Sequence, residues 1–213
     1  MKFQSTRDKL HWAVSLADRV TSKSASLAAL GHVFVSAADN TLTVRATNLE
    51  VSLELSVPVV VAEEGSLLVP GAVVANFLAN AGAEDKIEVG TQNQNLLLNA
   101  KGAKSVVKTF PSDDFPTFSH LETKNKLSVD ARELVSGLRS VLYSAATSDI
   151  KPEIASVYLY QNHGEGFIYC VATDAFRLAE KKVAYIKGPE DSKGELKIII
   201  PGRNVAEIMK VLD

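Results

Sequence analysis

Two short stretches, RATNLEVSLE (residues 45–54) and VATDAFRLAE (residues 171–180), determine how the chain is organised. Each follows an apolar alternating run, and each has Ala-Thr before a polar Asn or Asp. Thr173 lies 126 positions after Thr47. Asp, Asn and Thr at a strand end satisfy turn backbone N–H groups with their side chains. The shared pattern therefore predicts one turn that is built twice.

The similarity extends outward from these turns as an internal repeat. Phe3 matches Leu127 at an offset of 124, and Pro70–Gly71 matches Pro201–Gly202 at an offset of 131. Strand, helix, hairpin, strand-Pro-Gly and helix follow in the same order in both halves. Chance similarity of two α+β halves is the alternative, and the matched order counts against it. We expect an α+β fold of repeated modules, in which helices pack on antiparallel sheets.

A Pro-rich segment, FPSDDFPTF (110–118), predicts the boundary between the modules, because proline is unfavourable inside helices and strands. The expected modules span residues 1–118 and 119–213. At the offset of 131, Asp213 corresponds to Gly82, after which the first copy continues with three more strands. We therefore expect the second module to be truncated, with unpaired sheet edges. Such a module should be less stable than the first, or should associate.

Hydrophobic periodicity predicts the helices. The first begins at a cap on Thr6, and the second covers residues 73–82. The pair Asp130 and Glu133 forms a D-x-x-E capping box that opens the third helix. The fourth covers residues 204–212.

Period-two alternation predicts antiparallel hairpins. The stretches 32–38 and 41–47 flank Asp39–Asn40, a dipeptide typical of tight hairpin turns. The β region continues through residues 51–61. A second hairpin spans residues 155–173, which reproduces the order of the first copy.

Composition indicates an ordinary globular protein. Hydrophobic residues make up 46% and charged residues 23%, and the net charge is −2. This charge does not demand a nucleic-acid partner, although local basic patches remain compatible with it. A single cysteine excludes an intramolecular disulfide framework and fits a cytoplasmic location. We identify neither a signal peptide nor a membrane-spanning segment in the sequence.

The common catalytic motifs are missing from the sequence. The four histidines are scattered without metal-ligand spacing, and there is no Gly-rich phosphate loop or G-x-S-x-G elbow. A metal pair is one interpretation of Asp113–Asp114, but a solvated crossing segment is the better one. Cys170 has no neighbouring histidine in sequence and is interpreted as structural. We expect no enzymatic activity, no cofactor and no metal.

The second copy of the turn departs from the first in its last residues. Asp174 beside Arg177 could form a general base, but Asn48 at the equivalent position cannot act as one. We therefore interpret the acid as a turn residue. The following Phe-Arg-Leu suits partner recognition, because aromatic and arginine side chains are favoured interface anchors. The alternative is that Phe176 and Leu178 belong to the core.

Six stretches occur in a distinctive order and spacing: MKF, TLTVRATNLEVSLE, LLVPG, TFPSDDFP, VATDAFRLAEKKV and IIIPGRNVAEIMKVLD. Together they resemble the beta subunit of bacterial DNA polymerase III, the sliding-clamp family. The resemblance covers the whole chain, and the F-P-x-x-D-F-P and T-D-x-x-R-L segments are specific in combination. It implies the DNA-clamp fold, with three copies of one module per chain and two helices packed on antiparallel β-sheets in each. This sequence would hold the first module and most of the second, without the third.

The resemblance implies a non-catalytic processivity subunit. Two full-length chains would form a homodimeric ring around duplex DNA, which they hold by topology with sequence-independent, salt-sensitive contacts. Partners would be the replicative polymerase, the clamp loader and other proteins that bind through short peptide motifs. No cofactor and no membrane association are implied. The alternative from a different class is a two-module peptide-binding scaffold that does not act on DNA.

The family binds partner peptides in a pocket on its second module. The matching positions here are Ile154, Thr173, Ala175, Phe176, Arg177 and Leu178. The family usually has glycine and histidine where this chain has Ala175 and Phe176, which makes the implied pocket more apolar.

The resemblance also implies DNA-facing positions, at which this chain departs from the family pattern. These positions are Lys23, Ser24, Ala72, Ser148, Lys151, Pro152, Glu153 and Arg203. Ser24 and Ala72 stand where the family pattern has arginines. A diffuse positive field is the expected substitute, from Arg7, Lys9, Arg19, Lys23, Arg139, Arg203 and Lys210. An ordinary solvated helix face is the alternative for each of them.

Overall fold

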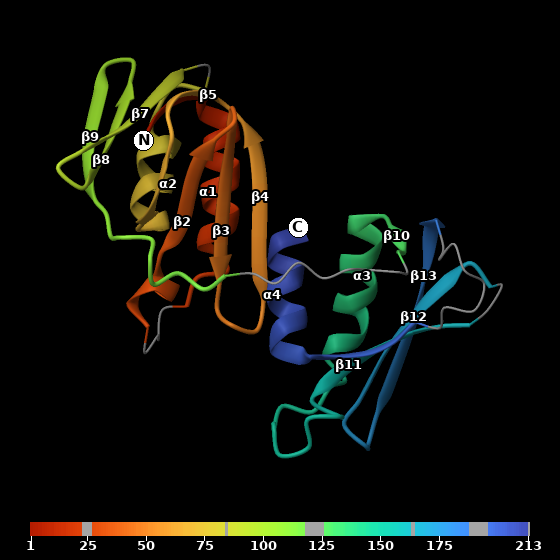
Figure 1. Cartoon of the computed structure of the whole chain (residues 1–213). Coiled ribbons are helices and arrows are strands. Elements are labelled where there is room, and N and C mark those ends of the chain that lie inside the picture. Colours follow the sequence, from red (N-terminus) through yellow and green to blue (C-terminus); the bar gives the residue numbers. More distant parts are fainter. Residues whose placement is uncertain (23–26, 84, 118–125, 163–164, 188–195, 213) are drawn as a thin grey trace. The chain divides into compact units, whose positions relative to one another are not determined.

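A computed structural model describes residues 1–22, 27–83, 85–117, 126–162, 165–187 and 196–212. The chain divides into two compact units, Met1–Phe118 and Ser119–Asp213. Each unit contains helices packed on antiparallel sheet (Figure 1).

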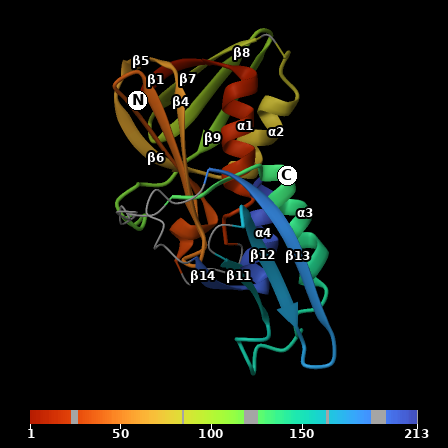
Figure 2. The ribbon, with the colours of Figure 1, turned by 90° about the vertical axis from the view of Figure 1, so that its right-hand side faces the viewer.

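The first unit is built from two antiparallel sheets and two main helices. Its elements are β1 (Lys2–Thr6), α1 (Arg7–Asp18), a 3₁₀ helix (Ala28–Gly31), β2 (Val33–Ala38), β3 (Thr41–Thr47), β4 (Ser52–Pro58), β5 (Val60–Glu63), β6 (Gly65–Val69), α2 (Gly71–Ala79), β7 (Lys86–Gln92), β8 (Asn95–Ala100) and β9 (Ala103–Lys108). The strand orders are β5-β1-β7-β8-β9 and β4-β3-β2-β6. Helices α1 and α2 lie side by side (Figures 1 and 2).

The core of the first unit lies between the helices and the sheets. Phe3 from β1, Leu10 from α1, Leu78 from α2 and Leu98 from β8 are all at most 3% exposed. The predicted β2–β3 hairpin is confirmed, since Asp39–Asn40 takes the left-handed backbone conformation of a tight turn, with φ angles of 48° and 56°.

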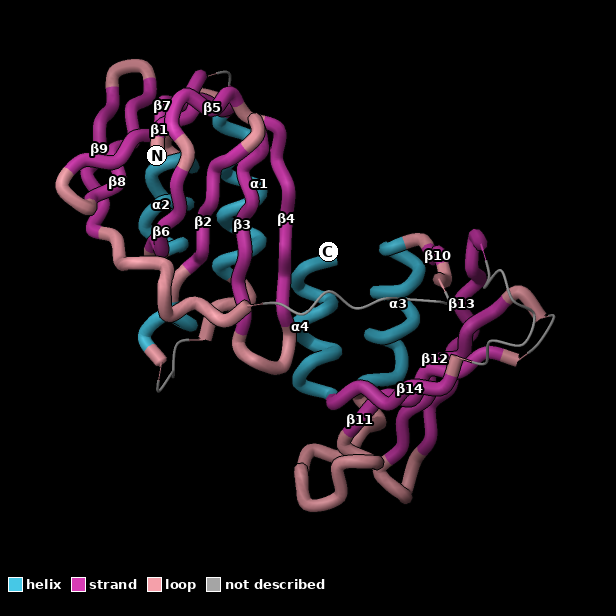
Figure 3. The backbone as a smooth tube through the Cα atoms, viewed as in Figure 1, coloured by secondary structure: helices cyan, strands magenta, loops and turns pink. Residues whose placement is uncertain are grey.

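The second unit contains one five-stranded antiparallel sheet. Its elements are β10 (Ser128–Val129), α3 (Ala131–Leu142), β11 (Ser156–Gln161), β12 (Phe167–Thr173), β13 (Leu178–Lys187), β14 (Lys197–Pro201) and α4 (Gly202–Leu212). The strand order is β10-β13-β12-β11-β14. Helices α3 and α4 lie side by side on this sheet (Figure 3). Leu138, Val157, Ile168, Cys170 and Val205 form its buried core.

The β region expected over residues 51–61 is present and is divided between two strands in different sheets. The chain leaves one sheet at Pro58, passes through Val59, and enters the other sheet as β5 beside β1. Proline has no N–H to donate, so it suits the end of a strand better than its interior. In the second unit the corresponding β13 is unbroken and pairs with both β12 and β10.

The first strand of each unit is paired differently, because β1 lies inside its sheet and β10 lies at an edge. Strand β1 pairs with β5 on one side and β7 on the other. Within the described residues, β10 pairs with β13 alone and β14 pairs with β11 alone. Both therefore present open edges in the described part of this unit.

The side-chain cap predicted at Thr6 is wrong. Its side chain makes no cap hydrogen bond, and the Arg7 N–H donates instead to the Asp85 carbonyl at 3.0 Å. Asp130 does cap α3, because its Oδ1 accepts from the N–H groups of Arg132 (2.9 Å) and Glu133 (3.1 Å). The backbone of a neighbouring loop thus replaces the expected cap in the first unit.

Candidate functional site

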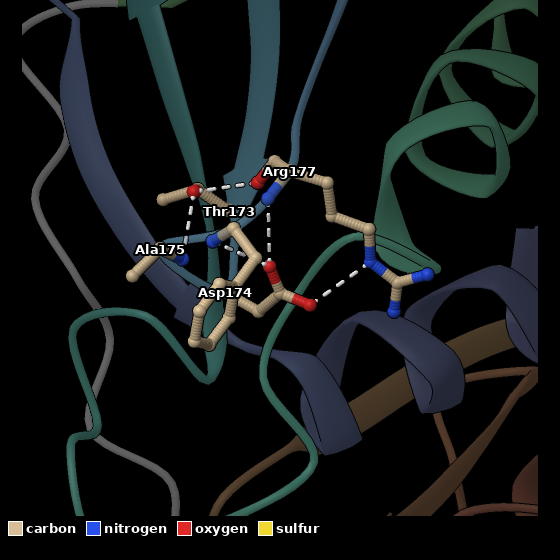
Figure 4. A network of polar contacts seen from close by, with 5 residues as sticks. Thr173, Asp174, Ala175 and Arg177 are labelled. Atoms are coloured by element: carbon tan, nitrogen blue, oxygen red, sulfur yellow. Dashed lines mark hydrogen bonds and ion pairs between the residues drawn. The ribbon is translucent and has the colours of Figure 1, made fainter.

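The loop between β12 and β13, Thr173–Arg177, is organised by its own side chains (Figure 4). The Ala175 N–H donates to Thr173 Oγ1 at 3.1 Å, and the Thr173 hydroxyl donates to the Arg177 carbonyl at 2.7 Å. Asp174 Oδ1 accepts from the N–H groups of Phe176 and Arg177, at 3.0 Å each. The backbone of this loop is therefore fixed by two residues, Thr173 and Asp174.

The first copy of the loop, Thr47–Val51, has the same bonds. The Leu49 N–H donates to Thr47 Oγ1 at 3.0 Å, and the Thr47 hydroxyl donates to the Val51 carbonyl at 3.0 Å. Asn48 Oδ1 accepts from the N–H groups of Glu50 (3.0 Å) and Val51 (2.8 Å). An amide and a carboxylate thus serve the same turn, which confirms the turn interpretation of Asp174.

The second oxygen of Asp174 distinguishes the two loops. Asp174 Oδ2 accepts from Arg177 Nε at 2.9 Å, whereas the first copy has Val51 at the arginine position. Hydrogen bonds from the backbone N–H groups of Arg177 and Phe176, together with the arginine charge, lower the pKa of Asp174. A carboxylate that accepts three hydrogen bonds and stays ionised is poorly suited to act as a general base at neutral pH.

The guanidinium of Arg177 also lies over an aromatic ring. Its central carbon is 5.6 Å from the ring centroid of Tyr143, the residue that follows α3. The ion pair and the cation–π contact together hold Arg177 in one direction, toward α3 (Figure 4). Sequence reasoning missed Tyr143. The available signal was an aromatic residue at the end of α3, on the side opposite the buried Leu138 and Val141.

The loop exposes apolar side chains rather than burying them. Phe176 is 98% exposed and Leu178 is 67% exposed, so the alternative that they belong to the core is wrong. Ile154 is half-buried in the segment before β11, and its carbonyl accepts from the Ala146 N–H at 2.9 Å. The structure thus brings five predicted pocket positions together in one loop and its adjoining strand, with Ile154 on a separate segment.

The predicted DNA-facing positions fall in separate places. Lys23 and Ser24 lie outside the described residues. Ala72 is exposed in the first turn of α2, and Arg203 is exposed in the first turn of α4. The segment between α3 and β11 carries the other four, all exposed: Ser148, Lys151, Pro152 and Glu153.

Several of the cations expected to form a diffuse field are engaged within the chain, among them Arg7 and Lys210. Arg7 donates through Nε to the Leu78 carbonyl at 2.8 Å and through Nη2 to the Ala79 carbonyl at 3.2 Å, and it pairs with Asp8. It therefore stabilises the C-terminal end of α2, where carbonyls lack helical partners. Lys210 pairs with Glu207 at 2.8 Å.

Other site types find no support in the described part of the chain. No group of three or more His, Cys, Asp or Glu side chains there is arranged to hold a metal ion. None of the described helices has the length and apolar character needed to span a bilayer.

Comparison with known proteins identifies the family. The family model for the N-terminal domain of the DNA polymerase III beta subunit matches residues 1–119, and the model for its central domain matches residues 128–213. The chain belongs to the DNA polymerase III beta subunit family. The beta sliding clamp of Bacillus subtilis is 25% identical over 224 residues, and that of Staphylococcus epidermidis is 23% identical over 222.

Both alignments take in 100% of this chain and 57% of the relative, so the chain spans a little over half the length of these curated relatives. Among solved structures, the Bacillus subtilis sliding clamp matches with a TM-score of 0.87 and 20% identity. The Pseudomonas aeruginosa beta subunit matches with a TM-score of 0.86 and 24% identity. Each match covers 100% of this chain and 57% of the solved chain, and the predicted DNA-clamp fold is confirmed.

Proposed function

We propose that this chain supplies two modules of a sliding clamp, a non-catalytic ring that encircles duplex DNA and tethers the replicative polymerase. The observation that carries the proposal is the match of the N-terminal and central family models, in order, across the two units. A ring holds DNA by topology, so a net charge of −2 is compatible with the role. The full-length protein would be a cytoplasmic homodimer that a clamp loader places on DNA.

A topological assay tests the encirclement. The full-length protein that carries this chain is loaded onto nicked circular duplex DNA with clamp loader and ATP, and the complex is isolated by gel filtration. If the protein stays bound to circular DNA and is released when the DNA is linearised, the result supports encirclement by a clamp. Retention that does not depend on circularity, or none at all, favours the alternative of a peptide-binding scaffold that does not act on DNA.

We further propose that partner peptides bind at the six positions on the second unit: Ile154, Thr173, Ala175, Phe176, Arg177 and Leu178. Three features support this assignment: the exposure of Phe176, the exposure of Leu178, and the fixed direction of Arg177. Exposed apolar side chains gain free energy when a partner buries them, and an arginine whose direction is already fixed loses little entropy on binding.

Alanine variants test this pocket. Phe176→Ala and Arg177→Ala in the full-length protein should each weaken binding of a fluorescein-labelled peptide from the organism's own polymerase by at least about fivefold, as expected for interface anchors. Fluorescence anisotropy measures the affinity. Glu50→Ala, at the position of Phe176 in the first copy, is the matched control and should leave it unchanged. Unchanged affinity for both test variants would exclude the pocket.

We also propose that the predicted DNA-facing positions lie near the duplex but contribute little to its affinity. Among them only Lys23, Lys151 and Arg203 are cationic, so few phosphate contacts are available. Lys151→Gln should reduce the slope of log K for duplex binding against log salt by about 0.9, the value for one phosphate contact.

A further inference from the structure

A pocket opens in the first unit where β1 continues past the end of β5. Strand β1 pairs with β5 only as far as Gln4, which is opposite Val60, whereas its pairing with β7 continues to Thr6. The chain just before β5 does not close this gap. Pro58 has no N–H to donate, and the Val59 N–H donates at 3.0 Å to a carbonyl of the β2–β3 turn. The last residues of β1 therefore form one wall of an open space.

The pocket combines positive charge with apolar surface. Its volume is about 330 Å³, within the size range of small-molecule sites. Its lining includes four side chains that can donate hydrogen bonds, Ser5, Thr6, Lys9 and Lys86, and an apolar wall of Pro58 and Val60. None of the lining residues is a carboxylate. Val60 is 65% exposed, so the apolar wall is open to a ligand.

The hydroxyl of Ser5 is a buried donor without a partner. Ser5 is only 8% exposed, and its Oγ makes no hydrogen bond within the described part of the chain. A buried polar atom in this state has lost its water without gaining a protein partner, which is uncommon in folded proteins. Because a hydroxyl can rotate toward an acceptor, a ligand oxygen in the pocket would satisfy it.

The two lysines of the pocket are available to a ligand. Among the described residues, neither Lys9 nor Lys86 forms an ion pair or a side-chain hydrogen bond. The carboxylates next to them in sequence are engaged. Asp8 Oδ1 accepts from Arg7 Nη1 at 2.8 Å, and Asp85 Oδ2 accepts from a backbone N–H of its own loop at 3.0 Å. The pocket therefore has two ammonium groups that these carboxylates do not bind.

The donors match a phosphate ester better than a carboxylate. A phosphate monoester has roughly two negative charges at neutral pH and three strong acceptor oxygens. Two ammonium groups and the hydroxyls of Ser5 and Thr6 can supply the opposite charge and the hydrogen bonds. A carboxylate offers one charge and two oxygens. Pro58 and Val60 would cover an apolar group attached to the phosphate.

We propose that this pocket binds a small organic phosphate. Lys9, Lys86 and the Ser5 hydroxyl hold the phosphate group, and the apolar part of the ligand lies against Val60. The inference goes beyond the proposed clamp function and does not depend on it. It assigns Lys9 to a small ligand instead of the diffuse field expected from the sequence.

A titration followed by methyl NMR tests the pocket in the full-length protein that carries this chain. The probe is hexyl phosphate. Hexanol lacks its phosphate group, inorganic phosphate lacks its apolar chain, and hexanoate has a carboxylate in place of the phosphate. Hexyl phosphate should shift the methyl signals of Val60, leave those of Val205 in the second unit unchanged, and bind at least about fivefold more tightly than each of the other three compounds.

Variants of the donors test which side chains hold the phosphate. Lys9→Gln/Lys86→Gln should weaken binding of hexyl phosphate at least about fivefold, and Ser5→Ala should weaken it about twofold. Lys101→Gln/Lys104→Gln removes the same charge from exposed positions of the same unit outside the pocket and should leave the affinity unchanged. Circular dichroism should show all the variants folded. Unchanged affinity in Lys9→Gln/Lys86→Gln or in Ser5→Ala, or an equal loss in the control variant, would overturn the proposal.

A competition experiment separates this pocket from contacts with DNA. A 30-base-pair duplex should not displace hexyl phosphate beyond the effect of sodium chloride at equal ionic strength. Displacement beyond that effect would return Lys9 and Lys86 to a field that faces the duplex, and it would overturn the proposal. Equal affinity for inorganic phosphate and hexyl phosphate would overturn it as well, because the apolar wall would then have no part in binding.

Discussion

Leu49 and Ala175 occupy the same position in the two copies of one loop, and both have a left-handed backbone, with φ angles of 74° and 76°. An L-residue with a side chain pays roughly 1–2 kcal/mol for this conformation. In each copy a threonine hydroxyl accepts the N–H of the strained residue, and the next side chain accepts the following two N–H groups. These hydrogen bonds stabilise the loop and so maintain the left-handed backbone at Leu49 and Ala175.

Replacing Ala175 with glycine should stabilise the second unit. Glycine adopts positive φ without the steric cost, although its greater freedom in the unfolded chain offsets about 0.5–1 kcal/mol. The expected net gain is about 0.5–1 kcal/mol. Urea unfolding followed by circular dichroism measures it, and Leu49→Gly should give a similar gain in the first unit.

Ala206→Gly is the control for this change. Ala206 lies in the interior of α4, in the same unit as Ala175, where glycine should cost about 1 kcal/mol relative to alanine. If Ala175→Gly lowers stability as Ala206→Gly does, the loop is not strained in solution.

Asp174→Asn should keep the loop and lose only its ion pair. Asn48 already serves as the backbone acceptor in the first copy, so the two backbone N–H groups should remain bonded. Hydrogen bonds from Arg177 and Phe176 lower the pKa of Asp174 below its ordinary value near 4. The carboxylate therefore contributes stability above the unfolded pKa and loses it as the pH falls through the lower folded pKa.

The stability difference between the parent chain and Asp174→Asn should thus be constant from pH 5 to 8 and should shrink below about pH 4. Urea unfolding at each pH measures it. A difference that changes between pH 6 and 8 would contradict the assignment. Asp174→Ala, which removes the backbone acceptor too, should also increase amide exchange at Phe176.

The order of the elements was predictable from the sequence because each rests on local signals. Asp39–Asn40 turns the first hairpin as its chemistry requires, and Asp130 caps α3. The repeat also predicted that Thr173 and Asp174 form a turn. The break at Val59 was not predictable, because the alternating pattern continues across Pro58 while the partner strand changes from β3 to β1.

The site was only partly predictable, because some of its contacts are tertiary. Phe176, Arg177 and Leu178 are contiguous, so their pattern and the family resemblance located them. Tyr143 lies 34 residues before Arg177 in sequence, and nothing local links the two. Arg7 was expected to face solvent, but it is bound to carbonyl groups at the end of α2, more than 70 residues away.

Tyr143 should act through Arg177 as a positioning residue for the proposed peptide pocket. Tyr143→Leu removes the ring face and should weaken peptide binding about two- to fivefold, the size of an exposed cation–π contact. Tyr143→Phe keeps the ring face and should bind as the parent does. Anisotropy titration measures affinity, and ¹⁵N relaxation of Arg177 Nε should show greater mobility only in Tyr143→Leu. Equal binding by both variants would remove Tyr143 from the site.

Replacing Gly137 in α3 with alanine should destabilise the second unit. A Cβ there would lie 2.4 Å from Val183 Cγ2 and 3.3 Å from Cys170 Sγ, both in the buried core. Alanine favours a helix by about 1 kcal/mol, but overpacking a core costs typically 1–3 kcal/mol. We expect Gly137→Ala to lower the unfolding free energy of the second unit by up to about 2 kcal/mol. Ser136→Ala, one position earlier and exposed, should be neutral or slightly stabilising in the same urea titration.

Cys170 should report on the second unit alone, because it is the only cysteine in the chain and lies fully buried in β12. Burial raises the pKa of its thiol to about 11, whereas an unfolded thiol titrates near 8.5. At pH 8 the native thiol should therefore react with a disulfide reagent only after the unit opens, and Ala175→Gly should slow that reaction. Labelling of the native chain as fast as of a free thiol would contradict the burial.

The same pKa difference makes the stability of the second unit depend on alkaline pH. Between about pH 8.5 and 11 the unfolded thiol loses its proton while the folded thiol of Cys170 keeps it. The unfolding free energy should then fall by up to about 1.4 kcal/mol for each pH unit in this range. Cys170→Ala lacks the thiol, so its stability relative to the parent chain should improve from pH 8 to pH 10. A constant difference between the two chains over that range would show that the thiol titrates alike in both states and that water reaches it in the folded sheet.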